Sequence, residues 1–226
     1  MTSRTDPAAA GARPGPTAEH RHQAAHWEGV HAGKAGDDVS WWQPQEGVWS
    51  DLWSDLPLAA DDPVIDVGAG SSTVVECLLD AGCSDVTVLD LSASALHRMR
   101  ERLGPRAEHV HEIVGDVRHL HGDGRYRLWH DRAVLHFLTD PADVDLYRES
   151  LLSALAPGGY AVVAAFAPDG PETCSGLPVH RYDADALLAV LGPQFALVRA
   201  DRRLHVTPWR AEQPFTVVVA RRRDVD

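Results

Sequence analysis

Residues 63–91 are the stretch that most strongly limits what this chain can fold into. They run in order through a short apolar segment at 64–67, a glycine turn at 68–71, a segment with helical spacing at 72–81 and a second apolar segment at 86–90. A short apolar run that ends at glycines is typical of a buried parallel strand. Glycines also let backbone N–H groups come close to a ligand. The stretch therefore predicts a strand–helix–strand unit that binds a nucleotide at the turn.

Two acidic residues in this unit narrow the choice of ligand. Asp90 ends the second strand, about two dozen residues after the first, where an acid can hold ribose hydroxyls. Asp66 stands just before the glycines, where its charge would repel a dinucleotide pyrophosphate and would suit a cationic or ammonium-bearing ligand. Thr73 also replaces the third glycine of a dinucleotide fingerprint. A nicotinamide-dependent oxidoreductase is therefore only a distant alternative.

The run Asp66-Val67-Gly68-Ala69-Gly70 resembles the first motif of the class I S-adenosylmethionine-dependent methyltransferases. Ser72 stands where that family often has a third glycine, and the resemblance extends from about Trp27 to the C-terminus. It implies a Rossmann-like three-layer α/β/α sandwich with a mostly parallel seven-stranded sheet and an antiparallel edge hairpin. It also implies S-adenosylmethionine as the cofactor and methyl transfer as the activity.

The same resemblance implies which residues bind the cofactor. Asp66 and the glycine turn would hold its methionine portion, Asp90 the ribose, and Asp116 the adenine. Trp27 and Trp42 could pack on the cofactor, because an aromatic face attracts a sulfonium cation, or could only cover the sheet edge. The complete expected set is Trp27, Trp42, Asp66, Gly68, Ala69, Gly70, Ser71, Asp90, Leu91, Ser92, Asp116, Val117 and His130.

The catalytic candidates are Asp131, His136 and His205. Asp131 falls with His130 and Arg132 at the carboxyl end of the next expected strand, where the methyl group and the acceptor would meet. It could orient the acceptor, hold the methionine portion, or pair with Arg132 inside the loop. His130 or His136 could take a proton, and His205 could act as a base or be an ordinary strand histidine.

The chain is expected to form one domain after a short arm. Residues 1–23 are rich in Ala, Pro, Gly and Arg without an apolar period, which predicts a disordered arm, and residues 24–226 form the methyltransferase domain. Within it, residues 24–57 would cover the cofactor and the acceptor, with a helix at 48–56, and the loop at 167–182 would line the acceptor pocket. Three histidines, His20, His22 and His26, are interpreted as solvated surface residues, and no metal site is expected.

Composition bears on location and partners. The net charge of −12 argues against nonspecific nucleic-acid binding. No apolar run approaches the ~20 residues of a membrane span, and the three cysteines fit a reducing cytosol. We therefore expect a cytoplasmic enzyme that methylates a small-molecule acceptor and binds neither nucleic acid nor a membrane. A protein-lysine methyltransferase is the alternative, and a non-catalytic cofactor-binding regulator is a distant one; the oligomeric state is left open.

Overall fold

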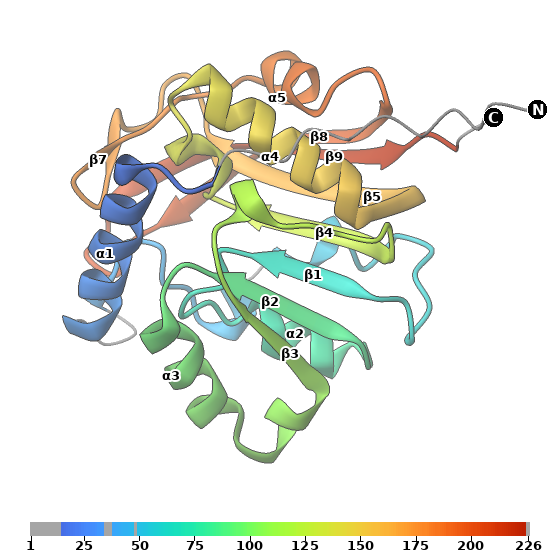
Figure 1. Cartoon of the computed structure of the whole chain (residues 1–226), viewed down its shortest axis with the longest axis horizontal. Coiled ribbons are helices and arrows are strands. Elements are labelled where there is room, and N and C mark those ends of the chain that lie inside the picture. The colour runs from blue at the N-terminus through green and yellow to red at the C-terminus, as the bar shows by residue number, and fades with distance from the viewer. Residues whose placement is uncertain (1–14, 34–37, 48, 225–226) are drawn as a thin grey trace, which may run out of the picture.

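The computed structural model describes residues 15–33, 38–47 and 49–224, and its centre is a single seven-stranded sheet (Figure 1). The strand order is β3-β2-β1-β4-β5-β9-β8. The strands are β1 (Val64–Val67), β2 (Val86–Asp90), β3 (Val110–Val114), β4 (Tyr126–Arg132), β5 (Leu155–Phe166), β8 (Phe195–Val206) and β9 (Glu212–Arg222). Strands β1 to β5 are parallel, and β9 is antiparallel to both of its neighbours. The expected mostly parallel sheet with an antiparallel edge hairpin is confirmed.

Helices cover both faces of this sheet (Figure 1). They are α1 (Ala18–Gly33), α2 (Val74–Asp80), α3 (Ala93–Leu103), α4 (Pro141–Ala154) and α5 (Ala184–Leu191). Successive residues of each strand point to opposite faces of the sheet and so belong to two separate hydrophobic cores. One core is shared with α2 and α3, and the other with α4 and α5. This arrangement is the expected three-layer α/β/α sandwich. In Figure 1, α1 lies beside the carboxyl ends of the parallel strands.

Shorter elements connect these layers. They are the 3-10 turns η2 (Gln45–Gly47), η3 (Ser50–Leu52), η4 (Gly104–His109), η5 (Val117–His119) and η6 (Leu135–Phe137), and the two-residue strands β6 (Thr173–Cys174) and β7 (Leu177–Pro178). The pair β6 and β7 forms a small hairpin within the expected 167–182 loop. Among the described residues, no helix has the length and apolar character needed to cross a membrane.

Local side chains explain where several helices begin. Ser92 caps α3 by accepting a hydrogen bond from Ala95 N at 3.1 Å. Asp183 caps α5 in the same way, with a distance of 2.8 Å to Ala186 N. These caps satisfy backbone N–H groups that have no partner inside the helix.

Two local predictions on the N-terminal side are wrong. Helix α1 begins at Ala18, inside the stretch 1–23 that we expected to be a disordered arm; residues 1–14 of that stretch lie outside the described residues. Its first turn is fixed because His20 N donates to Thr17 Oγ1 at 3.2 Å. The expected helix at 48–56 is replaced by η3 after Val48, which itself lies outside the described residues. Tertiary packing of neighbouring tryptophans, on Phe215 and on His130, overrides the helical spacing there.

Candidate functional site

A pocket opens at the carboxyl ends of the parallel strands, and residues of α1 help to line it. Its floor is the glycine turn at 68–70, and one wall is formed by α1 through Trp27 and His31. Gly68 has a φ of 66°, and a Cβ there would lie only 2.1 Å from Cγ2 of Val134. Only glycine fits at this position, so the turn keeps its backbone open to the pocket.

Asp66 and His130 form a buried pair on one wall of the pocket. They are register partners on β1 and β4, so their side chains point to the same face of the sheet. His130 Nδ1 lies 2.6 Å from Asp66 Oδ1, and the other carboxylate oxygen, Oδ2, is buried without a partner among the described residues. The pair therefore orients the imidazole ring and leaves one acidic oxygen available for a ligand.

Asp90 ties the end of β2 to the glycine turn. Its Oδ2 accepts a hydrogen bond from Gly70 N and its Oδ1 from Ser92 N, both at 2.8 Å. Burial raises the pKa of Asp90 to about 6. The His31 ring of α1 lies over the same turn, because a Cβ on Gly70 would lie 3.3 Å from His31 Cε1 and 3.5 Å from Asp90 Oδ2. Burial also lowers the pKa of His31 to about 4, so this ring is neutral at pH 7.

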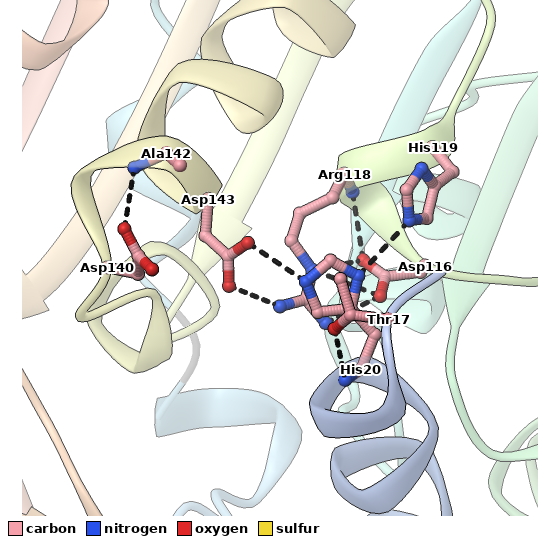
Figure 2. A network of polar contacts seen from close by, with 8 residues as sticks. All are labelled: Thr17, His20, Asp116, Arg118, His119, Asp140, Ala142 and Asp143. Carbon is pink, nitrogen blue, oxygen red and sulfur yellow. Dashed lines mark hydrogen bonds and ion pairs between the residues drawn. The ribbon is translucent and has the colours of Figure 1, made fainter. Parts of the chain in front are cut away.

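Asp116 belongs to a network that joins the end of β3 to α4 and to the start of α1 (Figure 2). The buried Arg118 guanidinium lies 2.9 Å from Asp116 Oδ1 through Nε and 2.5 Å from Asp143 Oδ2 through Nη1. Burial would raise the pKa of Asp116, but the hydrogen bonds from Arg118 hold it below its ordinary value. His20 Nε2 lies 2.9 Å from Asp143 Oδ1, and His20 Nδ1 lies 3.3 Å from His119 Nε2.

This network corrects the interpretation of His20 as a solvated surface residue. Only 6% of His20 is exposed, because it packs against Asp143 of α4 and His119 of η5. His20, Asp116 and His119 have possible ligand atoms within 4.8 Å of one another. Arg118 already supplies a positive charge to these acids, so the cluster is complete as a hydrogen-bonded network without an ion.

A second contact holds the middle of α1. Ser92 Oγ donates to Glu28 Oε2 at 2.7 Å, and Ser94 N lies 3.3 Å from the same oxygen. Hydrogen bonds from Ser94 and Ser92 lower the pKa of Glu28, so its carboxylate is ionised at neutral pH. Helix α1 is thus anchored over the pocket at two places, by His20 and by Glu28.

Comparison with known proteins identifies this arrangement. Residues 64–159 match the family model described as a methyltransferase domain. This match supports the resemblance of the chain to the class I S-adenosylmethionine-dependent methyltransferases. Nodulation protein S of Rhizobium tropici is 32% identical over 98 residues, which are 43% of this chain and 40% of that protein. The chain therefore matches less than half of this curated relative.

Solved structures share the fold of the methyltransferase domain over most of the chain. A methyltransferase from Anabaena variabilis superposes with a TM-score of 0.72 at 16% identity, over 96% of this chain and 100% of that one. The 1,6-didemethyltoxoflavin-N1-methyltransferase of Burkholderia thailandensis, solved with 1,6-didemethyltoxoflavin and S-adenosylhomocysteine, gives 0.63 at 22% identity over 97% and 100% of the two chains. The N-methyltransferase NodS of Bradyrhizobium japonicum WM9, solved with S-adenosylhomocysteine, gives 0.61 at 19% identity over 76% and 84%.

Most residues expected to bind the cofactor line the pocket of the methyltransferase domain. These are Trp27, Asp66, Gly68, Ala69, Gly70, Asp90, Leu91, Asp116, Val117 and His130. Three others do not line it: Trp42, Ser71 and Ser92. Trp41 takes the place expected for Trp42 and contacts Trp27 edge-on, with ring centroids 5.7 Å apart. Ser92 instead caps α3 and contacts Glu28.

Asp131 does not line the pocket, contrary to its expected catalytic position. The residues of β4 alternate between the two faces of the sheet, so the side chain of Asp131 points away from that of His130 and toward α4. Its Oδ2 accepts a hydrogen bond from Tyr147 Oη at 2.7 Å, and its Oδ1 from Val134 N at 2.8 Å. It also forms no ion pair with Arg132 among the described residues. Asp131 therefore holds the loop after β4 in place, and the alternation from Leu128 onward is the sequence signal that could have shown this.

The two histidine candidates also lie outside the pocket. Phe166 N donates to Nδ1 of the fully buried His136 at 3.4 Å, and burial lowers the pKa of His136 to about 3. His205 Nε2 lies 2.5 Å from the carbonyl oxygen of Ser40, and burial lowers the pKa of His205 as well. Both rings are neutral packing residues in this structure. Pocket residues outside the expected site set include His31, Trp41, Arg118, Arg132 and Phe137. Cys174 also lines the pocket, as expected for the loop at 167–182.

Proposed function

We propose that the protein transfers a methyl group from S-adenosylmethionine to a small-molecule acceptor. The observation that carries the proposal is that Asp66, Asp90 and Asp116, which lie near the carboxyl ends of three adjacent strands, all line one pocket. In an open α/β sheet, ligands bind outside the carboxyl ends of the strands, where the strand order reverses. Here that reversal lies between β1 and β4.

The donors and acceptors of the pocket suit each part of the cofactor. The unpartnered Asp66 Oδ2 fits the ammonium group of the methionine portion. Asp90 would accept from the ribose hydroxyls, and Asp116 with Val117 would face the adenine. Asp66 Oδ2 has no partner among the described residues, and each oxygen of Asp90 accepts one of the hydrogen bonds described above, so a ligand need not displace those contacts.

When bound, S-adenosylmethionine would supply an electrophilic methyl group whose bond to the sulfonium breaks as the acceptor bond forms, leaving S-adenosylhomocysteine. The residues of the chain would mainly align the reactants and exclude water. Trp27, Trp41 and Phe137 supply an apolar, aromatic wall for this purpose. His130 is the residue placed to take a proton from the acceptor, because Asp66 engages its Nδ1 and leaves Nε2 as the second ring nitrogen.

A small-molecule acceptor is supported by the cover over the pocket. Helix α1 is anchored by His20 at its start and by Glu28 in its middle. Cys174, from the 167–182 loop, lines the same pocket. The Burkholderia thailandensis neighbour was solved with a small heterocyclic molecule, which is consistent with this class of acceptor. These features favour a small molecule over a lysine side chain on a protein.

The proposal is tested in two steps. Isothermal titration with S-adenosylhomocysteine should give binding, whereas NADH should give none. Asp90→Ala should abolish the binding, and Asp85→Ala, at the other end of the same strand, should leave it unchanged. The protein is then incubated with methyl-labelled cofactor and cell extract. We expect label in a small soluble product; label in a protein band would favour the lysine alternative, and NADH binding would favour the oxidoreductase.

A further inference from the structure

Arg132, at the end of β4, is a half-buried cation with an incomplete set of partners. Its Nη2 donates to the carbonyl oxygen of Trp41 at 2.6 Å, whereas its Nη1 is buried and has no partner among the described residues. Burial lowers the pKa of Arg132 to about 10, a shift that Asp66 opposes without forming an ion pair. A buried guanidinium nitrogen without a hydrogen-bond partner is costly, so Nη1 is suited to receive an anionic acceptor atom.

The position of Arg132 points to the acceptor side of the pocket. Asp90 and Asp116 follow β2 and β3, on one side of β1, whereas Arg132 ends β4 on the other side. Phe137 and Cys174 line the pocket together with Arg132. The nucleoside and the guanidinium would therefore occupy opposite halves of the pocket, with Arg132 beside apolar surface.

Resting on the proposed function above, we propose that Nη1 of Arg132 binds an anionic oxygen of the acceptor, so that the acceptor is an organic acid with an apolar body. A guanidinium donates in a fixed plane that matches a carboxylate. The backbone contact to Trp41 holds that plane still, which leaves Nη1 in place for the ligand. The negative charge would also offset the positive sulfonium beside it.

The experiment uses protein saturated with S-adenosylhomocysteine and two probes of nearly the same shape, benzoate and benzamide. Binding is followed by the quenching of tryptophan fluorescence, since Trp27 and Trp41 line the pocket. We expect wild-type protein to bind benzoate about 10- to 100-fold more tightly than benzamide, the range for a hydrogen bond to a charged group. Arg132→Met should abolish this preference, and Arg132→Lys should keep part of it. The control Arg125→Met, at the opposite end of β4, should keep all of it.

The methionine portion of the cofactor also has a carboxylate, which Arg132 could bind instead of the acceptor. A second pair of probes distinguishes these two possibilities. S-adenosylhomocysteine should bind Arg132→Met as tightly as it binds the wild type. A loss for S-adenosylhomocysteine but not for 5′-methylthioadenosine, which lacks the amino acid, would assign Arg132 to the cofactor and overturn the proposal. So would a wild type that does not prefer benzoate, or a preference that survives in Arg132→Met. Failure of the wild type to bind S-adenosylhomocysteine would instead refute the proposed function, and the benzoate titration of the unloaded protein would still test Arg132.

Discussion

The raised pKa of Asp90 predicts how cofactor affinity depends on pH. Ribose hydroxyls donate hydrogen bonds, so they bind the ionised carboxylate better than the protonated one. Because burial raises the pKa of Asp90 to about 6, the carboxylate of the free protein is protonated below that pH. Cofactor binding would then have to release the proton, and affinity should fall as the pH is lowered from 7 to 5.

The size of this effect follows from the pKa. The ionised fraction of Asp90 falls from about 0.9 at pH 7 to about 0.1 at pH 5, so the affinity for S-adenosylhomocysteine should fall about tenfold, or about 1.4 kcal/mol. Two ionisable residues of α1 lie near Asp90, namely Glu28 and His31, and neither titrates between pH 5 and pH 7. Glu28 is ionised throughout because its pKa is lowered, and His31, with a pKa of about 4, stays neutral.

Isothermal titration of S-adenosylhomocysteine at pH 5, 6 and 7 measures the dependence directly. The control is Asp90→Asn, which has no titratable group and should bind weakly with nearly the same affinity at all three pH values. A wild-type affinity that does not change with pH would refute the reasoning. A tenfold change that persists in Asp90→Asn would assign the effect to another group and would refute it equally.

Three further predictions concern the framework of the site. Tyr147→Phe removes a hydrogen bond to the buried Asp131 and should lower the free energy of unfolding by about 1.5–3 kcal/mol, measured by urea denaturation; an unchanged midpoint contradicts this. Gly68→Ala should weaken S-adenosylhomocysteine binding more than tenfold, because the new Cβ would collide with a valine, whereas Gly82→Ala, which has a similar positive φ but open space, should not; equal effects contradict the argument. Glu28→Ala should speed amide hydrogen exchange in α1 while leaving β1 protected, and unchanged exchange in α1 would show that this contact does not anchor it.

Much of the central unit was predictable because its signals are local. The strands at 64–67 and 86–90 have the predicted bounds, since buried strands read as short apolar runs. Ser92 and Asp183 cap the helices that follow them, because a cap depends only on residues a few positions away. The resemblance implied a mostly parallel seven-stranded sheet with an antiparallel edge hairpin. The acids meet at one edge of this sheet because they lie near the carboxyl ends of parallel strands.

The catalytic predictions failed where side-chain direction mattered. His130 and Asp131 are neighbours in the chain, yet one lines the pocket and the other is buried against Tyr147 on the opposite face of the sheet. His136 and His205 were candidates because a histidine side chain can accept a proton. Both are buried outside the pocket, so they do not reach the site. Residue type and order do not specify such contacts, because they depend on which elements pack together.

The sequence by itself determined the strand–turn–helix–strand unit, its glycine turn and the acids at the strand ends, because backbone preferences and apolar periodicity act over short distances. Only the tertiary structure decided that α1 covers the pocket, that His20 is buried against Asp143, and that Arg132 presents an unpaired nitrogen. These contacts join residues that are as many as 123 positions apart, as in the hydrogen bond of His20 to Asp143. Their burial and charge arise only when the chain has folded, and the proposed recognition of an acidic acceptor depends on them.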